Sequence, residues 1–264
     1  MNGVRNNWIN GFSLGGFTIQ GFANDGVYLA CVKGFILSNN KTNYNGVYGL
    51  FPIFSEQGVL TNNEAKNTSS DAALYVGRSK YVQIIGNTAH HSLIGIQLEN
   101  SQFCTIANNR VYNNRVGVLV DKTPGYTPQG TEFSTSNNFV YSNIITNNNS
   151  SIQSSEGLPT GAGMILAGAD KTTIVGNQVS NNKSTGILVS SFTCPPPGCG
   201  ALPFDLAPDG NKIVWNIVRK NGDAPDPSID LLVADLSWDT TGHNNCWEHN
   251  QFGTSFPPSL PSCN

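Results

Sequence analysis

Short apolar clusters return at an even interval along most of the chain. Each cluster opens on a small residue, and the first five are Gly26, Gly49, Ala73, Gly95 and Gly117. The intervals between them are 49−26 = 23, 73−49 = 24, 95−73 = 22 and 117−95 = 22 residues. A repeat of about 20 to 30 residues without helical periodicity predicts a solenoid.

Asparagine marks a second position in the same repeat. Asn40, Asn63, Asn87 and Asn109 follow one another after 63−40 = 23, 87−63 = 24 and 109−87 = 22 residues. The segments between them, such as YVQIIG and IGIQL, are short and nearly continuously apolar, as buried parallel strands are. We therefore predict an all-β, right-handed parallel β-helix with about 22–24 residues per coil, in which these asparagines stack as a hydrogen-bonded ladder.

One domain, residues 1–264, accounts for the whole pattern. We expect coils over 1–240 and a C-terminal cap over 241–264, with extra residues inserted near 121–137, 147–161 and 190–211. Two insertions follow the strand that begins at the small residue and one precedes it. They are therefore expected at opposite edges of one face, where they wall a groove or project as ordinary solenoid loops.

The two ends of the chain differ in their sequence. The C-terminal segment is aromatic and proline-rich, which is typical of a cap that covers the last coil. The N-terminal segment FSLGGFTIQGF already has the repeat pattern, so an N-terminal cap is apparently missing. We expect either a fragment or self-association through the uncovered first coil.

The cysteines suggest an oxidising compartment. Cys246 is predicted to pair with Cys263 across the tail, and Cys194 with Cys199 in CPPPGC. Cys31 and Cys104 lie in apolar clusters and are predicted to be free and buried. No signal peptide is present in the sequence as written. An extracellular or cell-surface location is nevertheless expected from the predicted disulfides.

Charge is scarce, which excludes some partners. Charged residues make up 12% of the chain and the net charge is −3, so there is no basic surface for a nucleic acid. No apolar run approaches the roughly 20 residues of a membrane helix, and no membrane insertion is expected. A polysaccharide is the expected partner.

The candidate chemistry lies in columns that successive coils stack about 4.8 Å apart. Because charges are few, the charged residues of three adjacent coils become candidates. The predicted catalytic residues are Tyr75, Arg78, Glu99, Asp121 and Lys122. The predicted substrate-binding residues are Tyr28, Tyr48, Asp71, Gln97 and Arg115. Aromatic rings stack on sugar faces, and charged groups bind hydroxyls or carboxylates.

Two reactions suit these residues. Elimination from a uronide needs a base and a cation, with Arg78 or Lys122 to neutralise the carboxylate and Tyr75 or Lys122 to exchange protons. Hydrolysis needs two carboxyl groups, which Glu99 and Asp121 supply. A salt-bridge ladder that keeps the face soluble is the alternative.

No cofactor or metal is predicted. The four histidines, His90, His91, His243 and His249, are interpreted as structural. Calcium would need convergence of the late loops, whose aspartates are more typical of turns: Asp205, Asp209, Asp223, Asp226 and Asp230.

The segments GVYGLFPIFSEQGVLTNN, SDAALYVGRS, IGIQLENS and VGVLV, with the tail NNCWEHNQFGTSFPPSLPSC, resemble the secreted right-handed parallel β-helix repeat proteins of bacteria. The resemblance implies the pectate-lyase-like fold. That superfamily holds pectate lyases, alginate lyases and epimerases, polygalacturonases and proteins without known activity, so the resemblance leaves the function open.

One motif can be compared position by position. Mannuronan C5-epimerases carry Tyr-Gly-Phe-Asp-Pro-His, and YGLFPI at 48–53 is similar to it. Tyr48 is kept, whereas Phe51 and Ile53 stand where that motif has its functional Asp and His. Epimerisation of that type is therefore not expected. We expect a carbohydrate-active protein that cleaves an acidic polysaccharide by elimination, or else a non-catalytic structural, self-associating or glycan-binding solenoid.

Overall fold

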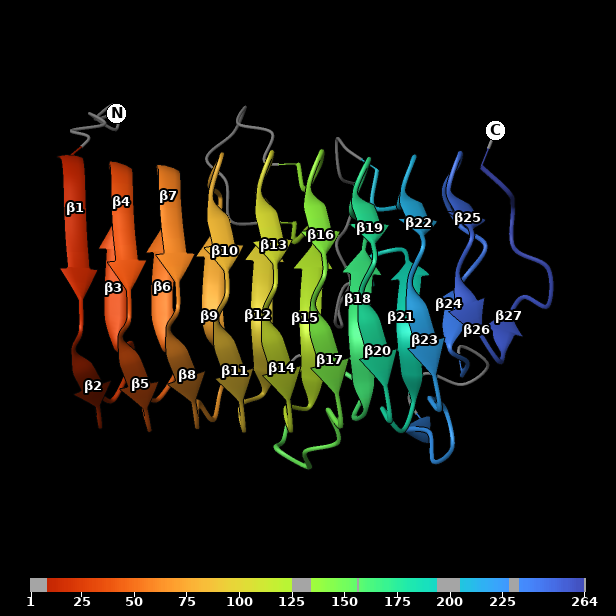
Figure 1. The fold of residues 1–264 in the computed structure, drawn as a ribbon, viewed down its shortest axis with the longest axis horizontal. Helices are drawn as coiled ribbons and strands as arrows, with labels where there is room; N and C mark the ends of the chain where they lie inside the picture. Colours follow the sequence, from red (N-terminus) through yellow and green to blue (C-terminus); the bar gives the residue numbers. More distant parts are fainter. Residues whose placement is uncertain (1–8, 125–133, 156, 194–204, 228–232, 264) are drawn as a thin grey trace.

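The computed structural model describes residues 9–124, 134–155, 157–193, 205–227 and 233–263. Its strands form three parallel sheets of nine strands each, stacked along one axis with β1 and β27 at opposite ends (Figure 1). Neighbouring strands within a sheet are three apart in chain order, so each coil contributes one strand to each sheet. The predicted parallel β-helix is confirmed.

The sheets are named A, B and C in the order in which the chain enters them. Sheet A contains β1 (Ile9–Gly15), β4 (Val32–Ser38), β7 (Glu56–Thr61), β10 (Gln83–Ile85), β13 (Thr105–Ala107), β16 (Phe139–Tyr141), β19 (Thr173–Val175), β22 (Lys212–Val214) and β25 (Cys246–Glu248). Sheet B contains β2 (Thr18–Gln20), β5 (Lys41–Asn43), β8 (Glu64–Lys66), β11 (Thr88–His90), β14 (Arg110–Tyr112), β17 (Ile144–Thr146), β20 (Gln178–Ser180), β23 (Ile217–Arg219) and β26 (Gln251–Phe252). Sheet C contains β3 (Val27–Ala30), β6 (Leu50–Ile53), β9 (Ala72–Gly77), β12 (Ile94–Glu99), β15 (Val116–Asp121), β18 (Ala162–Ala167), β21 (Thr185–Ser190), β24 (Leu236–Trp238) and β27 (Ser255–Phe256).

The repeated small residue lies where the chain enters sheet C. A Cβ added at Gly95 would lie 2.4 Å from Val111 Cγ1 and 2.6 Å from the Gly117 carbonyl oxygen. A larger side chain at this position would push the next coil away and disturb both sheets. The interval seen in the sequence therefore follows from a close contact between coils.

Asparagine ladders hold the corners together. In one ladder the backbone N–H and side-chain amide of each asparagine donate to Oδ1 of the next; for Asn87 and Asn109 these distances are 2.8 and 3.1 Å. The predicted ladder is confirmed and extends to eight residues: Asn40, Asn63, Asn87, Asn109, Asn143, Asn177, Asn216 and Asn250. The ladder satisfies buried amides and fixes the register of successive coils.

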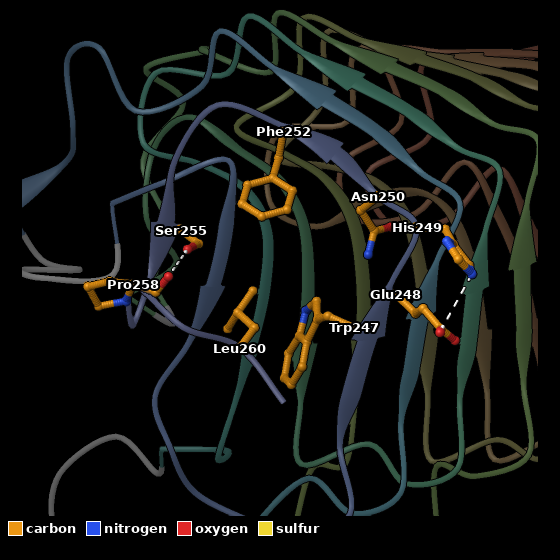
Figure 2. Close-up of a pocket in the computed structure, with 8 residues that line it drawn as sticks. All are labelled: Trp247, Glu248, His249, Asn250, Phe252, Ser255, Pro258 and Leu260. Carbon is orange, nitrogen blue, oxygen red and sulfur yellow. Dashed lines mark hydrogen bonds and ion pairs between the residues drawn. The ribbon is translucent and has the colours of Figure 1, made fainter. Parts of the chain in front are cut away.

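The predicted Cys246–Cys263 disulfide is present at the C-terminal end. Cys31 and Cys104 are free, the first partly buried and the second buried. The predicted Cys194–Cys199 bridge lies outside the described residues. Figure 2 shows a small pocket between the last coil and the tail, with Trp247 and Leu260 among its lining residues.

The longest connections between strands lie at the two edges of sheet C. The chain leaves β15 at Asp121 and enters β16 at Phe139, and it leaves β21 at Ser190 and enters β22 at Lys212. At the other edge it leaves β17 at Thr146 and enters β18 at Ala162. Sheet C is therefore the face that these connections border.

Candidate functional site

The outer face of sheet C carries a column of aromatic and amide side chains. Tyr28 pairs with Phe51 across β3 and β6, and Tyr75 pairs with Gln97 across β9 and β12. Phe51 and Tyr75 are in edge contact, with ring centroids 4.7 Å apart, and Tyr48 packs on both rings. Tyr28 is 60% exposed and Tyr75 only 3%, so this column runs from an open aromatic surface into a covered site.

A second column beside the first brings the charged groups together. Glu99 lies opposite Gly77 on one side and Asp121 on the other. Because Gly77 has no side chain, the ring of Tyr75 folds over it: an added Cβ would lie 2.5 Å from Tyr75 Oη. A glycine at this position therefore lets the phenol lie along the sheet toward the carboxylate column.

Arg78 is the cation of this cluster. Its guanidinium lies 3.6 Å from Glu99 Oε1, and the two side chains are only 10% and 13% exposed. The guanidinium also lies over the Phe54 ring, 5.6 Å from the centroid. Phe54 therefore supports one face of the cation, which is a favourable arrangement for a partly desolvated guanidinium.

Asp121 is held by two donors. Gln97 Nε2 donates to Oδ1 at 3.1 Å, and the Thr123 hydroxyl donates to Oδ2 at 2.7 Å. Gln97 is 4% exposed, and its Oε1 has no hydrogen-bond partner among the described residues. A buried acceptor without a donor is costly, so this oxygen is suited to receive a hydroxyl from a ligand.

Burial raises the pKa of the Tyr75 phenol well above its ordinary value, and the negative charges of Glu99 and Asp121 add to the effect. The phenol is therefore protonated at neutral pH. It can donate a proton, whereas direct use as a base would require a neighbour to take its proton first.

Lys122 lies next to the cluster but is engaged elsewhere. Its Nζ donates to Asp170 Oδ2 at 2.9 Å and to the Asp205 carbonyl at 3.0 Å. Burial raises the pKa of Asp170, and the ammonium of Lys122 opposes that rise. These contacts tie the connection at 205 to the edge of sheet C.

Arg115 and Asp71 lie at the opposite edge of sheet C, where the strands begin. Arg115 donates to the carbonyls of Leu158 and Ile152 at 2.7 and 2.9 Å, and it lies 3.4 Å from Asp226 Oδ2. Asp71 accepts, through its backbone carbonyl, a 2.8 Å bond from the Thr68 hydroxyl. The two residues thus border the site, and Arg115 holds the connection at residues 152 and 158 against the edge of sheet C.

We call the central group, Tyr75, Arg78, Gln97, Glu99 and Asp121, the sheet C site. Sequence reasoning brought these five together but missed Phe54, Thr123 and Asp170. Phe54 occupies the turn position that Arg78 and Asn100 occupy in the next two coils. Thr123 follows β15, and Asp170 lies in the short connection between β18 and β19. The repeat places these residues, but it gives no signal for the side chains that they contact.

The fold and this site together define a parallel β-helix protein with a cluster of charged and aromatic side chains on one sheet. The sequence profile of the family described as "Periplasmic copper-binding protein (NosD)" matches residues 1–158, and the chain belongs to this family. None of the curated proteins compared with the chain matches it.

Solved structures share the fold. The periplasmic alginate epimerase AlgG is similar at 18% identity and a TM-score of 0.67, over 87% of this chain and 48% of its own. The A-module of the mannuronan C-5 epimerase AlgE6 from Azotobacter vinelandii is similar at 13% identity and a TM-score of 0.66, over 92% of this chain and 62% of its own. An alginate lyase from Paenibacillus sp. str. FPU-7 is similar at 14% identity and a TM-score of 0.57, over 89% of this chain and 75% of its own. The chain spans about half the length of AlgG, and at these identities the likeness shows the fold alone.

The family description names copper, a metal that proteins bind through histidine, cysteine and carboxylate side chains. Among the residues that the structure describes, no group of three or more His, Cys, Asp and Glu side chains could hold a metal ion. This holds for calcium as well as for copper. Burial raises the pKa of the Cys104 thiol to about 12, so this sulfur is not a ready thiolate ligand. A site built from three or more of these side chains therefore does not fit the described residues.

No helix within the described ranges is long and apolar enough to cross a membrane. The pocket in Figure 2 lies at the C-terminal end, away from the sheet C site, and its volume is about 150 Å³. Ligand pockets for drug-sized molecules usually occupy about 300–1,000 Å³. We therefore base the function on the sheet C site.

Proposed function

We propose that the sheet C site binds an acidic polysaccharide and cleaves it by β-elimination. The observation that carries the proposal is the juxtaposition of Arg78, Glu99 and Tyr75 in a chain with few charges. A cation, a carboxylate and a protonated phenol are the three groups that elimination from a uronide requires.

Arg78 would bind the carboxylate of the sugar at the cleavage point. Its contact with Glu99 at 3.6 Å is longer than the roughly 2.7–2.9 Å of a tight charge-assisted hydrogen bond. A substrate carboxylate can therefore compete with Glu99 for the guanidinium. Neutralising the substrate carboxylate acidifies the proton on C5, which is the step that elimination must assist.

Glu99 would then accept the C5 proton, and Tyr75 would donate its proton to the leaving O4 oxygen. The C5–H electrons form the C4=C5 double bond as the C4–O4 bond breaks. The raised pKa of Tyr75 supports its role as the acid. Glu99 returns the proton to Tyr75, directly or through water, which resets the site.

The neighbouring groups support binding of a chain along the solenoid axis. The more exposed rings of the column, Tyr28 and Phe51, lie one coil apart, about 4.8 Å, and would stack on sugar faces beside the covered Tyr75. Gln97 Oε1 would accept a sugar hydroxyl. Asp121, held by Gln97 and Thr123, would orient that amide.

Three of the similar structures are described as an alginate epimerase, a mannuronan C-5 epimerase and an alginate lyase, which supports an acidic substrate. Another is described as a DFA-IIIase, so the comparisons support a carbohydrate substrate more broadly. The family description and that of AlgG are both periplasmic, which supports a location outside the cytoplasm. We extend this to secretion, in keeping with the Cys246–Cys263 disulfide.

The test is incubation of the purified protein with alginate, polygalacturonate and neutral polysaccharides, followed by mass spectrometry. We expect unsaturated fragments from an acidic polymer, and a loss of at least about 100-fold in rate for Arg78→Ala and for Glu99→Gln, in line with removal of one electrostatic or acid–base group. Arg219→Ala, an exposed arginine on sheet B, is the matched control and should keep full activity.

Two outcomes would contradict the proposal. Fragments heavier by one water would assign hydrolysis to Glu99 and Asp121, which lie one coil apart. Intact polymer with retained, Arg78-dependent binding would assign a glycan-binding module. The loss of the Asp and His of the epimerase motif at Phe51 and Ile53 is the observation that favours this second function.

A further inference from the structure

The pocket at the C-terminal end is lined by groups that the proposed reaction does not use. It lies between the last strands of sheets A and B, β25 and β26, and the tail that follows β27 (Figure 2). Three apolar side chains line it together with polar ones: Trp247, Phe252 and Leu260. With a volume of about 150 Å³ it is smaller than the sites of drug-sized molecules, so it has room for one small ligand.

Trp247 brings a buried hydrogen-bond donor to this pocket. Its side chain is 6% exposed, and its Nε1 has no hydrogen-bond partner among the residues that the structure describes. Figure 2 shows the nitrogen on the edge of the ring that faces the space between Leu260 and Asn250. A buried indole N–H is usually paired, because an orphaned donor costs free energy. This donor therefore indicates an acceptor that comes from outside the chain.

Asn250 ends the asparagine ladder and brings two more donors. Each ladder asparagine donates its backbone N–H and its side-chain amide to one oxygen of the next coil, as Asn216 does to Asn250 Oδ1 at 2.9 Å in both bonds. Asn250 Nδ2 donates to the Ile213 carbonyl at 2.6 Å. Within the described ranges nothing accepts its backbone N–H or its second amide hydrogen. We call these two groups the Asn250 fork; by the geometry of the ladder it points toward the next coil position, where the pocket lies.

A second ladder, at the corner between sheets B and C, shows which group closes such a fork. Its members are Asn114, Asn148, Asn182 and Asn221. The last of them, Asn221, donates its backbone N–H and Nδ2 to Asp235 Oδ1 at 3.0 and 2.8 Å. The chain thus places a carboxyl oxygen where the next asparagine oxygen would be. The Asn250 fork has the same pair of donors, so a carboxyl oxygen of a ligand suits it.

We propose that this pocket binds a single uronic acid unit. One carboxylate oxygen would accept both N–H groups of the Asn250 fork, and Trp247 Nε1 would donate to another oxygen of the ligand. The rings of Trp247 and Phe252 would cover the CH groups of the sugar. Glu248 does not oppose an anion here, because its carboxyl group is turned toward His249, 3.5 Å away (Figure 2). The site is separate from the sheet C site and does not depend on the proposed cleavage.

The test is titration of ¹⁵N-labelled protein with sodium galacturonate and with galactose, followed by NMR of the indole N–H groups. Neither monosaccharide has a glycosidic bond, so the result is independent of the proposed cleavage. Galacturonate should shift the Trp247 signal, which is assigned by its absence from Trp247→Phe. It should bind at least about tenfold more tightly than galactose, which lacks the carboxylate.

Trigalacturonate distinguishes two sources of the unit. Its binding is measured in Arg78→Ala, whose substitution in the sheet C site prevents the proposed cleavage of the probe. Binding as tight as that of galacturonate supports recognition of the end of a polysaccharide, and weaker binding supports recognition of the free sugar acid.

The variants test the named donors. Asn250→Asp replaces the amide donor by a carboxylate but keeps the oxygen that Asn216 needs, and it should weaken galacturonate binding at least about tenfold. Asn245→Asp is the matched control: Asn245 Oδ1 also accepts both N–H groups of the preceding asparagine, yet Asn245 does not line the pocket. Trp247→Phe keeps a ring and removes the donor, and should weaken binding by about three- to tenfold.

Circular dichroism of each variant establishes that it is folded, and Trp247→Phe carries the comparison if Asn250→Asp does not fold. The proposal is overturned if galacturonate leaves the Trp247 signal unmoved, if galactose binds as tightly, or if Asn245→Asp weakens binding as much as Asn250→Asp. Urea unfolding gives a second readout: galacturonate should raise the midpoint of the unmodified chain and of Asn245→Asp, but not that of Asn250→Asp.

Discussion

Replacing Asn109 by alanine should reveal how much of the stability depends on the asparagine ladder. Asn109 is 2% exposed and lies near the middle of the ladder. Its Oδ1 accepts from the backbone N–H and the side-chain amide of Asn87, at 2.8 and 3.1 Å. Its own amide donates to the Ile84 carbonyl at 2.9 Å and to Asn143 Oδ1 at 2.9 Å.

The substitution leaves two buried donors of Asn87 and the Ile84 carbonyl without these partners, while Asn143 Oδ1 keeps the backbone N–H of residue 109. Each orphaned buried group costs about 1–3 kcal/mol. A water molecule that enters the vacated space would recover part of this cost. We expect a loss of about 3–5 kcal/mol in the free energy of unfolding, a large share of the roughly 5–15 kcal/mol of a typical domain.

The control is the neighbouring Asn108→Ala. Asn108 is exposed, with a φ of 56°, so its substitution tests only the cost of alanine in a left-handed conformation, about 1 kcal/mol. Urea unfolding of both variants, followed by circular dichroism and by tryptophan fluorescence, measures the difference. Equal midpoints for Asn108→Ala and Asn109→Ala would refute the view that the ladder amides, rather than the corner conformation, stabilise the coil.

Two further predictions concern sheet C. The pKa of Tyr75 is raised in the folded state, so its contribution to stability is complete below about pH 10, the ordinary pKa of the unfolded chain, and is lost as the pH rises toward the folded-state pKa. Tyr75→Phe should therefore lose less stability between about pH 9 and 11 than the unmodified chain does. A difference spectrum in which Tyr75 of the folded protein forms phenolate at an ordinary pH would contradict the prediction. Arg115→Ala should lower the free energy of unfolding by about 1–3 kcal/mol and speed amide hydrogen exchange in residues 150–155 and 157–161. Arg219→Ala, which removes an exposed arginine, should do neither, and unchanged exchange in Arg115→Ala would show that Arg115 does not hold that connection.

The fold was predictable because each constraint of a coil recurs in the next. The small residue at Gly95 and Gly117 records a close approach between coils, and the asparagines at Asn87 and Asn109 record the ladder. Both constraints recur once per coil, so the sequence shows the length of the repeat even when the contacts are not known. The same register brought Tyr75, Gln97, Glu99 and Asp121 into adjacent columns.

The use of each side chain was less predictable, because it depends on segments that leave the repeat. Lys122 and Arg115 have suitable charges, yet Lys122 contacts Asp170 and the 205 connection, and Arg115 contacts Leu158, Ile152 and Asp226. The spacing of the repeat does not predict which part of the coil an inserted segment contacts. His91 shows a second limit, because its φ of 56° turns the chain after β11 and lets its ring contact that of His90, which the alternation of a strand does not predict.

The sheet C site lies in the coils of β9, β12 and β15, where the repeat is regular and the inward and corner positions already have structural roles. Inward positions such as Ala89 and Ile96 must fill the core, and corner positions must carry asparagine or serine. Chemistry is therefore confined to outward positions of the three sheets and the turns beside them. In the most regular coils those positions are held by paired strands on both sides, which gives the fixed geometry that a catalytic group needs.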